Sequence, residues 1–131
     1  MNFIPVQVTE KGTLSAGENF NVALPAQLAN AVRSKELREV ILGVRPEHLR
    51  LVGNGQAENP IPGVVDVVEP QGSTTILQVS VGTDTKVIAQ VNEQWGRQPG
   101  ERLQLSIPPD AIHLFDPNTD QRVGSSDDHE V

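Results

Sequence analysis

Three histidines are the side chains of this chain best suited to metal or acid–base chemistry, but their spacing argues against both roles. His48, His113 and His129 lie far apart in the sequence, and there is no cysteine to complete a ligand set. A zinc site needs three or four ligands, which usually come in short spacings. His48 and His113 each stand beside a leucine. We therefore expect these two imidazoles to be partly buried and bonded to backbone, with no metal site.

A short acidic motif near the end of the chain imitates the first half of a calcium-binding loop. Asp116, Asn118 and Asp120 have the required spacing, but the sixth position is Gln121 and the twelfth is Asp127. A calcium loop needs glycine and a bidentate glutamate at these positions. We therefore expect a turn here, followed by an acidic flexible tail over residues 117–131 with too few apolar side chains to become ordered.

The chain has no motif for nucleotide chemistry or nucleophilic catalysis. Nucleotide hydrolysis needs a glycine-rich loop that ends in Lys-Ser or Lys-Thr and surrounds the phosphates. The sequence contains neither this loop nor an interpretable Ser-His-acid spacing. We therefore predict that this chain is not an enzyme and holds no cofactor of its own.

Charge and composition exclude two further classes. The net charge is −7, and three phenylalanines and one tryptophan are the only aromatic residues. An acidic surface repels phosphate backbones, and few aromatic rings are available to stack on bases. No apolar run approaches the ~18 residues of a membrane span. We expect neither nucleic-acid binding nor membrane insertion.

The elements that must position these residues are short strands. Twenty-one glycines and prolines are spread through 131 residues, a pattern typical of many strands joined by turns. Alternating apolar residues predict strands at residues 3–9, 20–24, 40–44, 64–69, 74–81, 86–91, 103–107 and 112–115. Pro25 and the Leu28/Val32 spacing predict one short helix within residues 25–38. We expect strand 20–24 to pair with strand 3–9.

Two segments have the composition of connections. Residues 53–62 are rich in glycine, asparagine and proline, and we expect a loop that divides the chain if there are two sub-barrels. Pro70, Gln71 and Gly72 are expected to form the turn between two strands.

Four motifs in register indicate a family. They are Met1-Asn2-Phe3, Arg45-Pro46-Glu47-His48, Val67-Val68-Glu69-Pro70-Gln71-Gly72 and His113-Leu114-Phe115-Asp116. In this order and spacing they resemble the TOBE-type, OB-like regulatory domain at the C-terminal end of the ATP-binding subunits of bacterial carbohydrate ABC importers. The resemblance is to the maltose and glycerol-phosphate importer family and covers roughly residues 1–116.

The resemblance implies a mainly β fold, an OB-like (MOP/TOBE-type) small barrel with an additional strand set and one short helix. It implies a non-catalytic regulatory and dimerisation domain, with ATP and Mg bound in an ATPase domain that this chain does not contain. The implied partners are a second copy, the transmembrane subunits of a transporter and a cytosolic regulatory protein. The implied location is cytoplasmic, peripheral to the inner membrane. The alternative is a small-ligand or oxyanion-binding sensor of the same barrel type.

We expect structural roles for the charged motif residues. Arg45 and Glu47 should lock the end of a strand by bonding to backbone or to each other, and Glu69 should meet Arg45 across the barrel. Phe115 should anchor the last strand in the core.

Two surfaces are candidates for self-association. The first is Leu105-Ser106-Ile107-Pro108, an apolar strand expected to be exposed and stopped by prolines. The second is the loop around Trp95, whose large ring could mark a contact surface or plug the barrel mouth.

Overall fold

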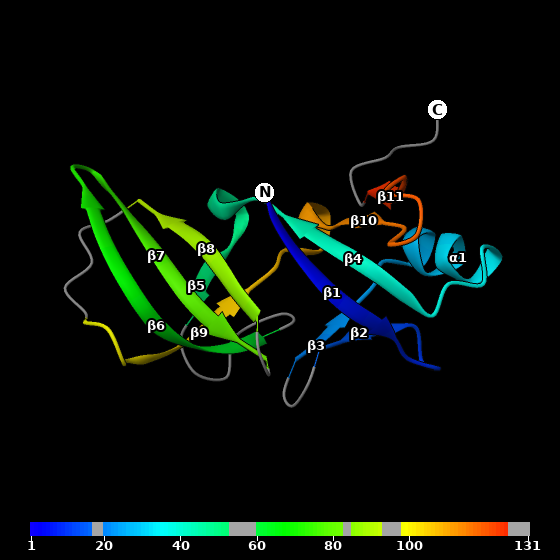
Figure 1. Ribbon diagram of the computed structural model, residues 1–131, viewed down its shortest axis with the longest axis horizontal. Helices are drawn as coiled ribbons and strands as arrows, with labels where there is room; N and C mark the ends of the chain where they lie inside the picture. The colour runs from blue at the N-terminus through cyan, green and yellow to red at the C-terminus, as the bar shows by residue number, and fades with distance from the viewer. Residues whose placement is uncertain (17–19, 53–59, 83–84, 93–97, 126–131) are drawn as a thin grey trace.

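Two curled antiparallel sheets lie side by side along the long axis of the protein (Figure 1). The computed structural model describes residues 1–16, 20–52, 60–82, 85–92 and 98–125. The elements in chain order are β1 (Asn2–Val8), β2 (Thr13–Ser15), β3 (Asn21–Ala23), α1 (Ala26–Ser34), β4 (Glu39–Val44), η1 (Pro46–His48), β5 (Arg50–Val52), β6 (Pro60–Gln71), β7 (Thr74–Val81), β8 (Thr85–Val91), β9 (Arg102–Ser106), η2 (Pro109–Ala111), β10 (His113–Phe115) and β11 (Arg122–Ser125).

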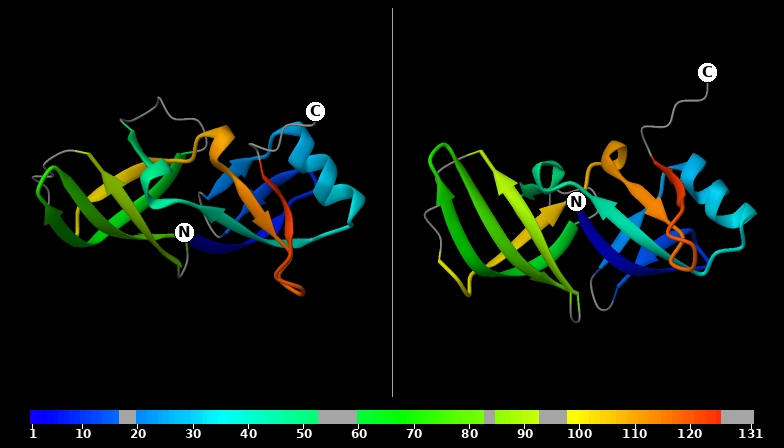
Figure 2. Two further views of the ribbon diagram at one scale, coloured as in Figure 1. Left: turned by 90° about the horizontal axis from the view of Figure 1, so that it is seen from above. Right: turned by 45° about the horizontal axis from the view of Figure 1, so that its top comes forward.

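The six-stranded sheet has the order β11-β10-β4-β1-β2-β3, and the five-stranded sheet has the order β5-β9-β6-β7-β8. The chain crosses from the first sheet to the second at residues 45–49 and returns at residues 107–112. The six-stranded sheet therefore contains the first and last strands of the described chain, blue and red in Figure 2. Strands β5 and β6 flank residues 53–59 and belong to the same sheet. Neither crossing therefore lies at residues 53–62, and the division of the chain into domains stays a prediction.

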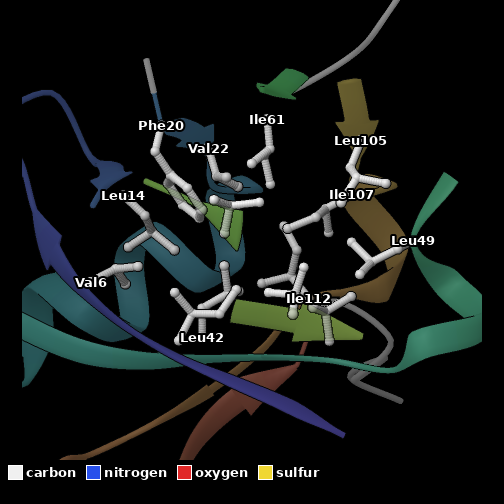
Figure 3. Packing of buried hydrophobic residues seen from close by; sticks show 14 of the residues in the cluster. Val6, Leu14, Phe20, Val22, Leu42, Leu49, Ile61, Leu105, Ile107 and Ile112 are labelled. Carbon is white, nitrogen blue, oxygen red and sulfur yellow. The ribbon is translucent and has the colours of Figure 1, made fainter. Parts of the chain in front are cut away.

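Alternation along the strands builds the core. In β7, Thr75, Leu77, Val79 and Val81 are buried, and the residues between them are half-buried. Successive strand residues point to opposite faces, so each sheet has one apolar inner face. The inner faces of both sheets contribute to one hydrophobic cluster (Figure 3). Its fully buried side chains include Phe20, Leu14, Leu42, Ile61, Leu105, Ile107 and Ile112.

Helix α1 closes the six-stranded sheet. The helix follows β3 at one edge of the sheet and packs against β11 at the other edge. Leu28 and Val32 are its buried residues, as the i,i+4 spacing predicts. The approach to β11 is so close that a Cβ on Gly124 would lie 2.9 Å from Cδ2 of Leu28. The sequence prediction of a short helix within residues 25–38 is confirmed.

The pairing expected for strand 20–24 is wrong. Strand β3 pairs with β2, and β1 pairs with β2 and β4. Strand β2 escaped prediction because Leu14 is its only large apolar residue, whereas Phe20, Val22 and Leu24 alternate around β3. A tight turn places β2 beside β1 first, with the Thr9 amide donating to the Thr13 carbonyl at 2.8 Å and Gly12 at φ +77°.

Two expected connections also contain strand residues. Pro60 and Pro62 belong to β6 and pair with β9, while pairing with β7 begins at Gly63. Proline fits there because only one side of the strand is paired. Pro70 and Gln71 also extend β6, and the turn consists of Gly72 and Ser73. Gly72 has φ +82°, as expected at the first position of a type II′ hairpin turn.

The prediction of a flexible tail over residues 117–131 is wrong for its first part, because the chain stays in the fold up to residue 125. Residues 122–125 form β11, which pairs with β10, and Val123 packs against the core. The Asp116 amide donates to the carbonyl of Gln121 at 2.8 Å and closes this hairpin. Residues 126–131 lie outside the described residues. In the described part of the chain, no helix is long and apolar enough to cross a membrane.

Candidate functional site: the junction between the two sheets

The side chain of Asn2 joins the six-stranded sheet to the edge of the five-stranded sheet. Its Nδ2 donates to the carbonyl of Ile88, and its Oδ1 accepts from the Ile88 amide, both at 2.8 Å. Ile88 is in β8, the edge strand of its sheet. An edge strand presents unpaired N–H and C=O groups, and a carboxamide offers the same donor and acceptor as a peptide group. Asn2 therefore acts in place of a neighbouring strand at this point.

The Arg-Pro-Glu-His segment forms a sharp corner at the same edge. Arg45 follows β4 in an extended conformation, and Pro46 begins the single turn of η1. This follows the rule that proline disfavours helical backbone in the residue before it and is accepted at a first helical position. The His48 amide donates to the Arg45 carbonyl at 2.9 Å, and the next residue, Leu49, is buried in the core.

Two of the family motifs therefore meet at the junction. The turn η1 packs against β8, and the side chain of Asn2 in β1 bonds to the same strand. The corner turns the chain out of the six-stranded sheet into β5 of the other sheet, and Asn2 ties the first strand to the same edge. Together they fix how the two sheets sit against each other.

The polar locks expected at the corner are absent from the described residues. The side chains of Arg45 and Glu47 are exposed, and neither side chain bonds to the other or to another described residue. His48 is exposed as well, so its expected burial is wrong. The backbone bond of η1 and the buried Leu49 hold the corner, and the charged side chains point to solvent.

Glu69 and Gly72 lie far from this junction. Glu69 is an exposed residue near the end of β6 that pairs with Ile76, and the described residues include no ion pair between it and Arg45. The long β6–β7 hairpin carries Glu69 away from the corner (Figure 1). The expected contact between Glu69 and Arg45 is therefore wrong.

In the fourth motif, His113-Leu114-Phe115-Asp116, the ring of Phe115 lies on the outer side of the six-stranded sheet. Phe115 is half-buried, and its ring meets Phe3 edge to face with centroids 5.7 Å apart and an interplanar angle of 68°. The core position expected for Phe115 is therefore wrong, because Leu114 takes the inward position in β10. His113 is half-buried, as expected, and has an interaction partner.

The acidic motif after β10 is used to build a turn. Oδ1 of Asp116 accepts from the Asn118 amide at 2.9 Å, and the carbonyl of Asp116 accepts from the Asp120 amide at 2.8 Å. Asp120 has φ +58°, a conformation that aspartate tolerates better than most residues. The side chain of Asp116 thus has a local structural role in the β10–β11 connection.

The first surface expected for self-association is not a surface. Leu105, Ser106, Ile107 and Pro108 are all buried. Leu105 and Ser106 belong to β9, which is an interior strand because it pairs on both sides, with β5 and β6, and Ile107 continues into the core. Trp95, the second candidate, lies outside the described residues.

One cleft in the described part of the chain has a lining that does not favour an anion. It has a volume of about 1070 Å³ and lies between α1 and the β1–β2 turn. Glu10, Glu36 and Glu39 line it together with Arg33 and Arg38, so carboxylates outnumber guanidinium groups. An oxyanion site needs an excess of amide or cationic donors. The alternative of an oxyanion-binding sensor stays a prediction.

Sequence reasoning missed the role of Asn2 and its partner. The two residues are 86 positions apart, and Ile88 contributes only backbone atoms. No residue pattern marks such a contact. The one available signal was the position of Asn2 within the Met1-Asn2-Phe3 motif.

Comparison with known families matches both parts of the chain. The TOBE domain family matches residues 42–115, and the MalK OB fold domain family matches residues 1–49. The chain therefore belongs to the TOBE domain family, in the form found in ATP-binding proteins of ABC importers. The expected family and the OB-like, mainly β fold are confirmed.

Individual relatives agree with this assignment. An uncharacterised ABC transporter ATP-binding protein, y4oS, of Sinorhizobium fredii is 38% identical over 94% of this chain and 31% of its own length. The sn-glycerol-3-phosphate import ATP-binding protein UgpC of Escherichia coli O157:H7 is 34% identical over 94% of this chain and 33% of its own length. The sulfoquinovosyl glycerol transport ATP-binding protein SmoE of Agrobacterium fabrum is 37% identical over 67% and 24%, respectively. The chain thus spans at most about a third of each relative.

A solved structure shares the fold. The cytoplasmic molybdate-binding protein ModG superposes with a TM-score of 0.67 at 19% identity, covering 88% of this chain and 96% of ModG. At this identity the likeness shows the architecture of paired OB-type sheets and nothing of the ligand.

Proposed function

We propose that this chain is the non-catalytic regulatory and dimerisation domain of an ATP-binding subunit of a carbohydrate-type ABC importer. The observation that carries the proposal is the family match: relatives named as import ATP-binding proteins align with 94% of this chain but only a third of themselves. The remaining two thirds of such a protein have room for a nucleotide-binding domain, whose motifs this sequence lacks.

The junction between the sheets supports a mechanical role. Asn2 and the η1 corner tie the two sheets together, and the hydrophobic cluster runs through both. We expect a domain joined in this way to move as one body. Two such bodies that stay in contact while their ATPase portions open and close would serve as a hinge, and a ligand that prefers one arrangement would bias transport.

The partners follow from this role. The whole protein would bind the transmembrane subunits of a transporter at the cytoplasmic face of the membrane, and a cytosolic regulatory protein could act on this domain. The names of the relatives point to a phosphorylated or sulfonated glycerol compound or a sugar as cargo. ATP and Mg would be bound by the ATPase portion of the whole protein.

The test compares the whole ATP-binding subunit with a version that lacks residues 1–131. Both are assembled with their transmembrane subunits, and mass in solution and ATP turnover are measured. We expect the intact subunit to dimerise and to couple ATP turnover to substrate. The shortened subunit should keep nucleotide binding but lose stable dimerisation and tight coupling. Unchanged dimerisation and coupling without residues 1–131 would contradict the proposal.

A further inference from the structure

The outer face of the six-stranded sheet carries a compact group of apolar side chains. We call it the outer apolar patch, and it consists of Met1, Phe3, Pro5, Ile41 and Phe115. Met1 is 46% exposed and Phe3 is 59% exposed, the largest exposures among the large apolar residues described. Exposed aromatic rings of this kind are typical of contact surfaces.

The strand register places the patch on one face. Phe3 stands opposite Gly43, and Pro5 stands opposite Ile41, which in turn stands opposite Phe115. Residues directly opposite each other in paired strands share a face of the sheet. A shallow cleft of about 570 Å³, lined in part by Pro5, Ile41 and Pro117, continues the patch along the sheet.

Gly43 gives the patch its shape. A Cβ on this glycine would lie 2.8 Å from Sδ of Met1 and 2.9 Å from Cε2 of Phe115. The absence of a side chain therefore lets Met1 and Phe115 pack closely against the sheet, where the ring of Phe115 also contacts that of Phe3. The patch is organised before any partner binds, which lowers the entropy cost of docking.

We propose that the outer apolar patch docks onto the ATP-binding portion of the longer protein, the part that precedes residue 1. This inference rests on the proposed function. Met1 is itself a member of the patch and β1 begins at the next residue, so the preceding polypeptide leaves from the edge of this surface. The relatives are about three times as long as this chain, so a protein of this family has a further portion that can cover the patch.

The size of the patch favours an attached partner over a free one. A stable interface between separate proteins takes about 20–30 residues from each side. Five side chains are far fewer. An attached domain needs less contact, because a short connection holds it at an effective concentration on the order of millimolar.

The first experiment measures side-chain exposure by hydroxyl-radical footprinting of the whole subunit and of residues 1–131 alone. We expect labelling of Met1, Phe3 and Phe115 to fall several-fold in the whole subunit. Val67, exposed on the outer face of the other sheet, is the accessible reference, and fully buried Phe20 is the protected reference. Equal labelling of Phe3 in both proteins would overturn the proposal.

The second experiment uses a matched pair of variants, Phe3→Gln and Val67→Gln. Each replaces an exposed apolar side chain, so both should leave the melting temperature of residues 1–131 nearly unchanged. In the whole subunit, Phe3→Gln should increase several-fold the rate of limited proteolysis just before residue 1, and Val67→Gln should not. Equal proteolysis rates for the two variants would count against docking through the patch.

The outcomes separate this inference from the function on which it rests. If the parent reading frame encodes no ATP-binding portion, both the proposed function and the proposed docking are overturned. An ATP-binding portion that leaves Phe3 fully labelled would overturn the docking alone. Patch protection in isolated residues 1–131 that grows with concentration would assign the surface to a second copy and overturn the proposal.

Discussion

At the scale of single residues, the carboxamide of Asn2 replaces a strand neighbour for Ile88. Asn2→Ala would leave the amide and carbonyl of Ile88 unpaired at a junction where Asn2 is only 8% exposed. We expect the free energy of unfolding to fall by about 2–3 kcal/mol, since each unsatisfied buried group costs roughly 1–3 kcal/mol. Urea denaturation measures the loss. Gln7→Ala, at an exposed position of the same strand, is the control and should stay within about 0.5 kcal/mol of the parent. Equal midpoints for the two variants would show that the Asn2 bonds contribute nothing.

Glu36 is a residue in a conformation that suits glycine. Its φ is +53°, and it follows Lys35, the C-cap of α1. The amides of Glu36 and Leu37 donate to the carbonyls of Arg33 and Val32, respectively, both at 3.1 Å. These two bonds form a Schellman motif, whose left-handed position is usually glycine. Glu36→Gly should therefore raise stability by about 0.5–1 kcal/mol by removing the strain of the side chain.

At the neighbouring position we expect the same substitution to have the opposite effect on stability. Lys35 ends the helix with φ −93°, where glycine relieves no strain and only adds freedom to the unfolded chain. Lys35→Gly should lower stability by about 0.5–1 kcal/mol. A thermal melt of both variants checks the sign. If Glu36→Gly melts below the parent protein, the strain at φ +53° is not a cost to folding.

At the scale of elements, the β7–β8 connection touches the six-stranded sheet through a glycine. Gly82 has φ +61°, and a Cβ there would lie 2.5 Å from the carbonyl oxygen of Ala16. Gly82→Ala should cost about 3 kcal/mol, because a positive φ and a steric clash add together. Gly72 also has a positive φ, but a Cβ there would meet no atom within 4 Å, so Gly72→Ala should cost only about 1 kcal/mol.

Chemical denaturation of these two glycine variants separates strain from contact. The excess loss in Gly82→Ala reports the approach of the hairpin to Ala16. Similar losses for Gly72→Ala and Gly82→Ala would show that the two sheets can move apart at this point without cost.

The last strand is the second element whose contribution can be measured. Removal of residues 117–131 takes away β11, its ladder with β10, and the contacts of Val123 and Gly124 with the core and with Leu28. We expect a clear fall in melting temperature, because α1 loses the strand against which it closes the sheet. Removal of residues 126–131 alone is the comparison and should have the smaller effect. Equal melting temperatures for the two deletion variants would show that β11 contributes no stability, as expected of a flexible tail.

At the scale of the whole molecule, we expect the chain neither to bind nor to hydrolyse nucleotides. Purified residues 1–131 lack the phosphate-binding loop, so we expect neither ATP binding by calorimetry nor phosphate release. The whole ATP-binding subunit is the positive control under the same conditions. Stoichiometric, magnesium-dependent ATP binding by residues 1–131 would contradict the assignment as a regulatory domain.

Patterns of local sequence determined much of this protein. Alternation over residues 74–81 fixed the bounds of β7, and the Leu28/Val32 spacing located α1. Both signals are strong because they repeat within one element and need no distant partner. The motifs around Arg45, Glu69 and His113 indicated the family for the same reason, since they depend only on residue identity and order.

Only the tertiary structure decided which surfaces are covered. Leu105–Pro108 has the composition of an exposed strand end, but Leu105 and Ser106 pair on both sides, with β5 and β6, and Ile107 and Pro108 are buried. The positions of Phe115 and β11 depend on β4 and α1, which lie far away in the sequence. The two bonds from the side chain of Asn2 go to backbone atoms of Ile88, which every residue has. A sequence records what each residue can do locally, and burial depends on neighbours that only the folded chain brings together.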